Sequence, residues 1–477
     1  MSSTSLLGSL LSSANTSTAA DLSTILQAAT GAATPGIDVA AAVNSAVTAA
    51  RAPEDTWNSQ ISVLQSQSNA LTSIQSNVTS LDNDMQALNS LNGPLAATTV
   101  TSSNTSVVTA TATSGSPTGN NVVVVNNLAS TASYSSTTVA SASTMLPAES
   151  FTITNNSGAA ATITTGSGVN TLADLQTAIN GSGLGLTASI ISDASGSRIA
   201  IASNTSGSSG NFTVTSTGSG FGFASAVTGN NASLTVNGIS ISSASNTVAG
   251  AIPGLTLNLW GTSSAGTSVS LSVAPDTATA AAAINQFVTD YNTVITDLNS
   301  EFNNTAGSGQ GSLAQDTAVR NLQSELLQAS SYTAAPASGS SSTTVPNLTS
   351  MGISVNADGT LTVNSSALAS TLQNNFSDVQ NFFQGASLNG FGSSLDKQLT
   401  SFISPADGAF TVDLQSISTQ TSGLKADITN FEANVIAPLR TKLTSDLSQA
   451  EVLLQQLPTE MRQIDTQLGY NTSTTGG

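Results

Sequence analysis

The stretch that decides the fold reads TWNSQISVLQSQSNALTSIQSNVTSLDNDMQALNS and occupies residues 56–90. Apolar side chains recur in it every seven residues. In its second half, each heptad has a second apolar side chain three residues after the first. The seam consists of Trp57, Leu64, Leu71, Ile74, Val78, Leu81, Met85 and Leu88. Such a heptad seam is typical of a helix that packs against a partner helix. Because the apolar stripe is narrow, this helix needs that partner to be stable in water.

A second seam lies near the other end of the chain, where the spacing alternates between three and four residues. Its apolar members are Leu414, Ile417, Leu424, Ile428, Phe431 and Val435, with Thr421 at the position between Ile417 and Leu424. The simplest partner for the first helix is therefore the second one. We expect an α+β fold with a helical coiled-coil leg built from both chain ends, β-rich heads inserted between them, and mobile termini.

The apolar stripe resumes after residue 435 and continues almost to the end of the chain. It comprises Leu443, Leu447, Leu454, Leu457, Met461, Ile464 and Leu468. Its register slips at Pro438, and Pro458 interrupts it, so we predict a bend or break rather than one rigid helix. We interpret this tail as a hinged extension that docks on something else. The mobile terminal segments are predicted to be residues 1–45 and 436–477.

The middle of the chain changes from helical to strand periodicity at Thr98 and returns to helix after Pro275. Short β-branched runs separated by Asn, Gly and Pro predict strands joined by turns. We divide this region into a first β-rich head (93–131 and 228–275) and a second one (132–227). The helical leg domain is then 46–92 and 276–435. Within it, Asp358-Gly359 between two alternating runs predicts a hairpin turn rather than a calcium loop.

Composition excludes several classes of function. The 477 residues contain 8 Lys plus Arg, 26 Asp plus Glu, and neither Cys nor His, for a net charge of −18. So few basic side chains argue against binding of nucleic acid or of an anionic membrane surface. No apolar run is long enough to insert in a membrane, and no cleavable signal peptide is recognisable. Without Cys or His, thiolate and imidazole chemistry are excluded, and we expect no cofactor.

Patterns that resemble catalytic or ligand-binding motifs have simpler interpretations. Asp82 and Asp84 are interpreted as solvated acids on an outer helix face, since residues two apart do not face each other. The GSGLG and GSGFG runs at 181–185 and 218–222 are interpreted as turn glycines, because neither sits between a strand and a helix as a nucleotide loop does. Two Ser-x-x-Lys spacings lack their usual partner motifs. We therefore assign no catalytic, cofactor-binding or metal-binding residue.

Four stretches of the chain resemble the bacterial flagellar filament cap family, also called hook-associated protein 2. They are the segment from GIDVAAAVNSAV through DNDMQAL near the amino terminus, SLTVNGISISSASNTVAGAIPGLTLNLWG, FVTDYNTVITDL, and NLTSMGISVNADGTLTVNSSALASTLQNNFSDVQNFFQG. This resemblance implies export through the flagellar type III apparatus without signal cleavage. It also implies a ring-like homo-oligomer at the distal filament tip that helps flagellin fold and insert, and in some members a role in adhesion.

Two other functions stay open on the sequence alone. A Ser/Thr-rich exported surface adhesin with a helical stalk would show the same alternation of helical ends and β middle. A glycan-active enzyme would need two carboxylates in a cleft, yet the β middle has only Glu149, Asp174 and Asp193 between Asp84 and Asp276. We therefore favour a structural protein that is not an enzyme.

Overall fold

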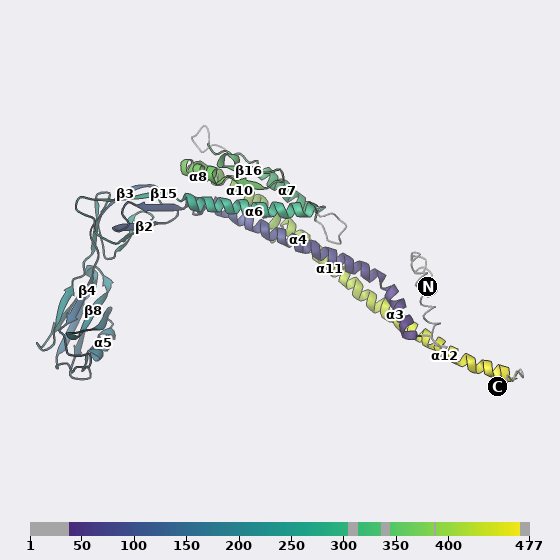
Figure 1. Ribbon diagram of the computed structural model, residues 1–477, viewed down its shortest axis with the longest axis horizontal. Helices are drawn as coiled ribbons and strands as arrows, with labels where there is room; N and C mark the ends of the chain where they lie inside the picture. The colour runs from purple at the N-terminus through teal and green to yellow at the C-terminus, as the bar shows by residue number, and fades with distance from the viewer. Residues whose placement is uncertain (1–37, 304–312, 335–343, 386–387, 468–477) are drawn as a thin grey trace, which may run out of the picture. The chain divides into compact units, whose positions relative to one another are not determined.

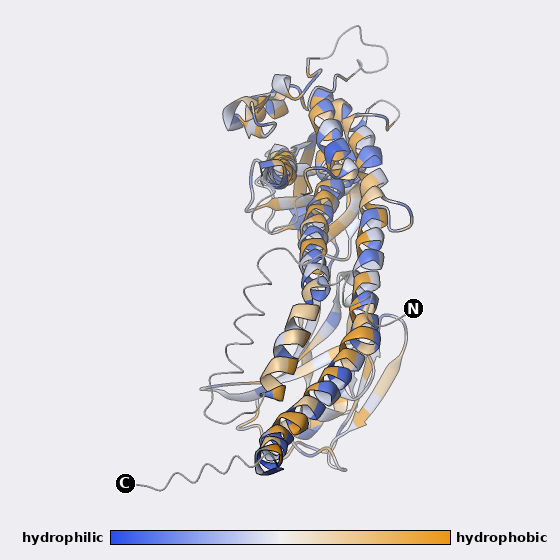
Figure 2. Cartoon of the chain, turned by 90° about the vertical axis from the view of Figure 1, so that its right-hand side faces the viewer, coloured by the Kyte–Doolittle hydropathy of each residue, from blue (hydrophilic) through white to orange (hydrophobic). Residues whose placement is uncertain are grey.

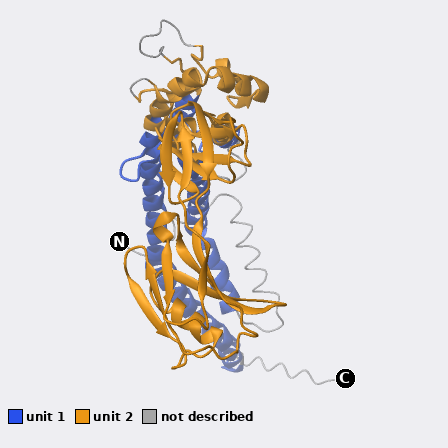
Figure 3. Ribbon diagram, turned by 90° about the vertical axis from the view of Figure 1, so that its left-hand side faces the viewer, with its two compact units in different colours: residues 1–79, 293–326, 398–477 blue, residues 80–292, 327–397 orange. Residues whose placement is uncertain are grey.

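The computed structural model describes residues 38–303, 313–334, 344–385 and 388–467. It divides into two compact units (Figure 3). Unit 1 is Met1–Thr79, Thr293–Leu326 and Gln398–Gly477, and unit 2 is Ser80–Asn292 and Leu327–Lys397. The predicted α+β class, with helices at both ends and a β-rich middle, is confirmed. Of the predicted mobile termini, residues 1–37 and 468–477 lie outside the described residues.

Unit 1 is helical in its described parts. It contains α3 (Val39–Ala50), most of α4 (Ala52–Asn89), α11 (Ala409–Phe431), a π-helical turn η4 (Glu432–Ile436) and α12 (Ala437–Gln467), all labelled except η4 in Figure 1. It also takes parts of α6 (Thr277–Asn303), α7 (Thr317–Ala329) and α10 (Phe391–Ile403). Asp38 caps α3 by accepting a 2.9 Å hydrogen bond from the Ala41 amide. Acidic Glu54 and Asp55 lie in the first turn of α4, where the helix dipole favours them.

The predicted break in the tail is wrong, because α12 is continuous from Ala437 to Gln467 with Pro458 inside it. Pro438 directly follows the π-helical turn η4, where the hydrogen-bond pattern departs from that of an α-helix, so the amide that proline lacks is accommodated there. At Pro458, the carbonyl of exposed Leu454 loses its helical donor, and water can replace that donor. The described residues of the two predicted mobile segments, 38–45 and 436–467, are mostly helical.

The first β cluster of unit 2 is formed by strands from two separate stretches of chain. A five-stranded antiparallel sheet has the order β1-β15-β3-β11-β12, and a three-stranded sheet has the order β13-β14-β2. Between them lie the fully buried side chains of Val108, Val123, Leu234, Leu257 and Leu271. The strands are β1 (Thr98–Ser102), β2 (Val108–Ala112), β3 (Gly119–Asn127), β11 (Ala232–Val236), β12 (Ile239–Ser243), β13 (Thr247–Ile252), β14 (Leu255–Leu259) and β15 (Val269–Pro275).

The second β cluster is inserted between β3 and β11. Its sheets have the orders β10-β4-β8-β7 and β6-β5-β9, and helix α5 (Leu172–Asn180) packs on β7. Figure 1 labels β4, β8 and α5 of this cluster. Thr171 and Asp174 form a capping box at the start of α5. The strands are β4 (Thr131–Ser136), β5 (Ser150–Asn155), β6 (Ala160–Thr164), β7 (Leu186–Asp193), β8 (Gly196–Ser206), β9 (Phe212–Ser216) and β10 (Phe223–Val227). Its core includes Phe151, Leu175, Ile199 and Phe221.

The two ends of this insertion lie side by side. The amide of Ser130 donates to the Asn230 carbonyl at 2.9 Å, and its hydroxyl donates to the Thr228 carbonyl at 2.9 Å. The chain therefore leaves and re-enters the first β cluster at almost the same place.

The GSGFG run at 218–222 is a loop that encloses a carboxylate of its own chain. Glu149 is 9% exposed, and its Oε1 accepts hydrogen bonds from the amides of Gly220 and Phe221, at 2.5 and 3.2 Å. Its Oε2 accepts a 3.1 Å bond from the Ser216 hydroxyl. A Cβ at Gly218 would lie 2.5 Å from the Glu149 carboxyl carbon, so the glycine permits this close approach. The amides that could have held a phosphate are thus used internally.

Glu149→Ala is expected to destabilise the second β cluster by roughly 1–3 kcal/mol, because it leaves the amides of Gly220 and Phe221 without an acceptor in a largely buried site. Hydrogen exchange of the full-length protein would show the loss as faster exchange in β5 and β9 with α12 unchanged. Glu460→Ala, at an exposed position of α12, is the control. Equal exchange in the Glu149 variant and the wild type would contradict this account of the loop.

Unit 2 also contains a helical part with an aromatic core. Its members are the carboxy-terminal turns of α4 from Ser80, the first part of α6, the end of α7, η3 (Thr349–Met351), α8 (Ser365–Asn374), α9 (Phe376–Gln384) and the first part of α10. The rings of Phe287, Phe382, Phe383, Phe391 and Tyr332 pack with centroids 5.1–6.4 Å apart. The hairpin β16 (Ile353–Val355) and β17 (Leu361–Val363) turns at Asp358-Gly359, where Gly359 has φ +86°, so the predicted hairpin is confirmed.

Candidate assembly surfaces of the helical unit

The two predicted seams meet within unit 1 as an antiparallel pair of helices. Trp57 of α4 packs edge-on against Phe431 of α11 with ring centroids 5.5 Å apart. Near the opposite end of the pair, Gln75 Nε2 reaches Thr411 Oγ1 at 3.5 Å. Residue numbers therefore rise along α4 as they fall along α11.

Burial along the seams is graded. On α4, Leu71, Ile74, Val78, Leu81, Met85 and Leu88 are at most 1% exposed, while Trp57 and Leu64 are half-buried. On α11, Ile417 is buried, whereas Leu414, Leu424, Ile428 and Phe431 are half-buried. Figure 2 shows apolar and polar residues alternating along the long helices.

One predicted seam residue is replaced by its neighbour. Val435 is 42% exposed, while Ile436 is 1% exposed. The cause is the π-helical turn η4, in which an additional residue per turn rotates the following side chains. Heptad reasoning missed Ile436 because it assumes an unbroken α-helical period. The four-and-four spacing from Val435 through Leu439 to Leu443 was the available signal.

Helix α3 covers the start of the tail. Val43 and Val47 form a small core with Ile436, against which Leu443 and Leu447 of α12 also pack. Arg51, just after α3, forms ion pairs with Glu54 of α4, at 2.8 Å, and with Glu432 of η4. Leu443 and Leu447 of the predicted docking stripe therefore already contact a helix of their own chain.

The rest of the tail stripe is uncovered in the structure. Leu454, Leu457, Met461 and Ile464 are 37–59% exposed, and they lie on one face of α12 at spacings of three and four residues. Leu468 lies outside the described residues. Singly exposed leucines are common, but four on one helix stripe are typical of a surface that binds another helix.

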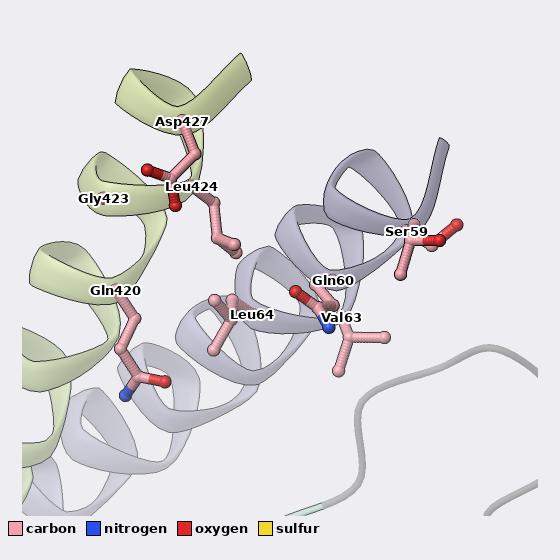
Figure 4. A pocket seen from close by; sticks show the side chains of 9 residues that line it. Ser59, Gln60, Val63, Leu64, Gln420, Gly423, Leu424 and Asp427 are labelled. Atoms are coloured by element: carbon pink, nitrogen blue, oxygen red, sulfur yellow. The ribbon is translucent and has the colours of Figure 1, made fainter. Parts of the chain in front are cut away.

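A groove opens between α4 and α11 where the seams are not tightly closed. It has a volume of about 640 Å³. The lining residues are Thr56, Ser59, Gln60, Val63, Leu64, Gln420, Gly423, Leu424 and Asp427. Figure 4 shows Leu64, Leu424 and Gln420 directed into the space between the two helices. Gln60 interrupts the heptad and Gly423 lacks a side chain, so neither helix fills its own side of the seam there.

Gly423→Ala is expected to stabilise unit 1 by roughly 0.5–1 kcal/mol, because glycine in a helix interior costs about that much relative to alanine. A Cβ at this position meets no atom within 4 Å, so no clash offsets the gain. Thermal unfolding followed by circular dichroism measures the change. Gly392→Ala in α10 is the matched control, since its Cβ would lie 3.0 Å from the Phe383 carbonyl oxygen. A lower midpoint for Gly423→Ala would contradict the open groove.

The interpretation of Asp82 and Asp84 as solvated acids is wrong. Asp82 is 5% exposed and lies against Asp396 of α10, while half-buried Asp84 lies against Asp290 of α6. Burial, and secondarily the facing carboxylate, raises the pKa of Asp82 to about 6 and that of Asp84 to about 7. All four carboxylates belong to unit 2.

Within the described ranges, no cluster of three or more acidic side chains is suited to hold a metal ion. No helix in the described part of the chain is long and apolar enough to cross a membrane.

Comparison with known proteins decides the family. The family models "Flagellar hook-associated protein 2 N-terminus" and "Flagellar hook-associated protein 2 C-terminus" match residues 35–132 and 229–459, together well over half of the chain. The chain belongs to the hook-associated protein 2 family. The unmatched residues between the two models contain nearly all of the second β cluster.

Two relatives and one solved structure support this family assignment. The B-type protein of Pseudomonas aeruginosa is 27% identical over 346 residues, which cover 64% of this chain and 69% of the relative. The A-type protein of that species is 30% identical over 182 residues, 36% of this chain and 35% of the relative. The D1-D2-D3 domains of the flagellar cap protein FliD from Escherichia coli match with a TM-score of 0.56 and 25% identity, over 75% of this chain and 99% of that one. These names describe a structural cap protein, not an enzyme family.

Proposed function

We propose that this chain caps the distal tip of the flagellar filament as a ring-like homo-oligomer. In that position it would promote the folding and insertion of flagellin exported by the flagellar type III apparatus. Membership of the hook-associated protein 2 family, with its fold-level match to a flagellar cap protein, is the observation that carries the proposal.

The surfaces of unit 1 fit such a role physically. A cap must hold its neighbours and yet exchange contacts each time a flagellin subunit is added. Half-buried seams, an open groove and an exposed apolar stripe can exchange partners, whereas a closed core cannot. The chain also has no cysteine, so no disulfide would oppose its passage through a narrow export channel in an unfolded state.

Deletion of the gene is the test of this function. Cells without the chain should grow hooks without filaments and release flagellin monomers into the medium, and a plasmid copy should restore filaments. Flagellin in the culture supernatant and electron microscopy of the cells measure both effects. A deletion strain that builds normal filaments and swims, but attaches poorly to surfaces, would replace the cap proposal with a surface adhesin.

The ring is tested separately on purified protein. Electron microscopy should show rings or paired rings of the full-length chain. Particles that stay monomeric at all concentrations would remove the ring from the proposal while leaving the deletion result to decide the rest.

A further inference from the structure

Helix α4 carries a buried carboxylate, Asp82, and a half-buried one, Asp84, that face carboxylates rather than cations. Asp82 lies within hydrogen-bonding reach of Asp396 on α10, and Asp84 lies within such reach of Asp290 on α6. No donor among the described residues reaches Oδ1 of Asp82 or Oδ2 of Asp84, although both atoms are buried. Two ionised carboxylates at such a distance repel each other, and a proton held between them is the simplest missing partner.

The side chains that donate hydrogen bonds to the pairs are neutral amides. Gln86 donates to Asp82 Oδ2 at 2.8 Å, and Gln286 donates to Asp290 Oδ1 at 3.1 Å. Asp396 is the acidic group that faces Asp82 from α10, and Asp290 is the one that faces Asp84 from α6. No ion pair joins any of the four carboxylates to a cation within the described ranges, although Lys397 follows Asp396 in α10. The repulsion is thus unrelieved once both members of a pair are ionised.

We propose that each pair shares one proton and that the two pairs form a proton-dependent lock, which fixes α4 to α10 and α6 in acid and loosens as the pairs ionise. The lock concerns the helical part of unit 2 and needs no partner protein. It is independent of the proposed cap function, so either can fail without the other.

The direction of the pH effect follows from linkage. The folded protein raises the pKa of Asp82 to about 6 and that of Asp84 to about 7, against about 3.9 in an unfolded chain. The folded state therefore binds more protons in this range, and its stability falls as pH rises. The contribution is complete below about pH 4 and is lost as pH passes through about 6 to 7. Each pair titrates as a unit, so these values belong to the pairs.

Hydrogen exchange of the full-length protein at about pH 5.5 and about pH 8, corrected for intrinsic exchange rates, tests the lock. Peptides covering 80–89 should lose protection at least tenfold between these conditions, because the pKa of Asp84, about 7, lies well above the lower pH. Peptides covering 391–397 should lose about fourfold, because the pKa of Asp82, about 6, lies only slightly above it. The β7–β8 hairpin of the same unit is the internal reference and should change little. Equal protection of the helical peptides at both pH values would overturn the proposal.

Asparagine resembles a protonated aspartate in shape and carries no charge. Asp82→Asn/Asp84→Asn should therefore abolish the loss of protection at the higher pH, and so should the reciprocal pair Asp290→Asn/Asp396→Asn. Asp427→Asn, at an exposed position of α11, is the matched control and should keep the wild-type loss. Variants that lose protection as strongly as the wild type would contradict the lock.

Two further experiments, an NMR titration and the addition of divalent cations, test the remaining explanations. Carbon NMR should show the carboxyl groups of Asp82 and Asp84 titrating near pH 6 to 7, and titration of both near pH 4 would refute the shared protons without any variant. Millimolar calcium or magnesium, compared with a chelator, should not restore protection at the higher pH. Restoration by either ion would assign the pairs to a divalent cation instead of a proton.

Discussion

Leu71→Asp is expected to unfold the paired helices of unit 1 at a cost of roughly 2–5 kcal/mol, since it removes a fully buried aliphatic side chain and buries a charge. Leu424→Asp should cost less, roughly 1–2 kcal/mol, because Leu424 is half-buried at the groove. The order of the two variants therefore tests the graded burial of the seams.

The two tryptophans allow this effect to be measured locally. Trp57 lies in the seam and Trp260 in the first β cluster, so a Trp260→Phe background leaves fluorescence that reports on unit 1 alone. Denaturant unfolding in that background gives the free energy of each variant. Thr72→Asp adds the same charge at the neighbouring exposed position and should change stability by less than about 0.5 kcal/mol. Unchanged unfolding of Leu71→Asp would show that this seam is not packed as described.

The second large effect concerns the exposed stripe of α12. We propose that Leu454, Leu457, Met461 and Ile464 dock on a neighbouring copy of this chain during assembly. Leu457→Asp/Met461→Asp should then abolish filament growth while leaving unfolding within about 0.5 kcal/mol of wild type, because the two side chains are 47% and 59% exposed.

A control variant that adds the same two charges elsewhere on α12 distinguishes a loss of docking from a general effect of negative charge. Thr459 and Gln463 lie on the opposite side of α12 and are exposed, so Thr459→Asp/Gln463→Asp should leave filaments intact. Filament length by electron microscopy of complemented cells is the readout. Equal growth with both double variants would remove the stripe from the assembly surface.

Hydrophobic periodicity predicted the long helices and the β middle, because each depends on residues close together in sequence. The pairing of the two seams could also be predicted from the sequence, since both helices carry heptads. The burial of Ile436 could not, because a π-helical turn shifts the period by one residue. The carboxylate pairs were missed for another reason: Asp396 and Asp290 are distant in sequence, and only the packing of α10 and α6 on α4 brings them to Asp82 and Asp84.

The loop around Glu149 shows the limit of motif reasoning. Its glycines were interpreted from the sequence as turn glycines, yet the loop amides bind a carboxylate far away in the sequence. Similarly, the role of α3 required the structure, because Val43 and Val47 form too short a stripe to identify Leu443 and Leu447 as their partners.

The central claim is that the helical unit, and not the second β cluster, carries filament assembly. Residues 132–227 can be excised because Ser130 already contacts Thr228 and Asn230. The most direct measurement is filament growth in a deletion strain complemented either with this excised chain or with Leu457→Asp/Met461→Asp. The account predicts filaments with the excised chain and bare hooks with the stripe variant. Bare hooks with the excised chain and normal filaments with the stripe variant would contradict it.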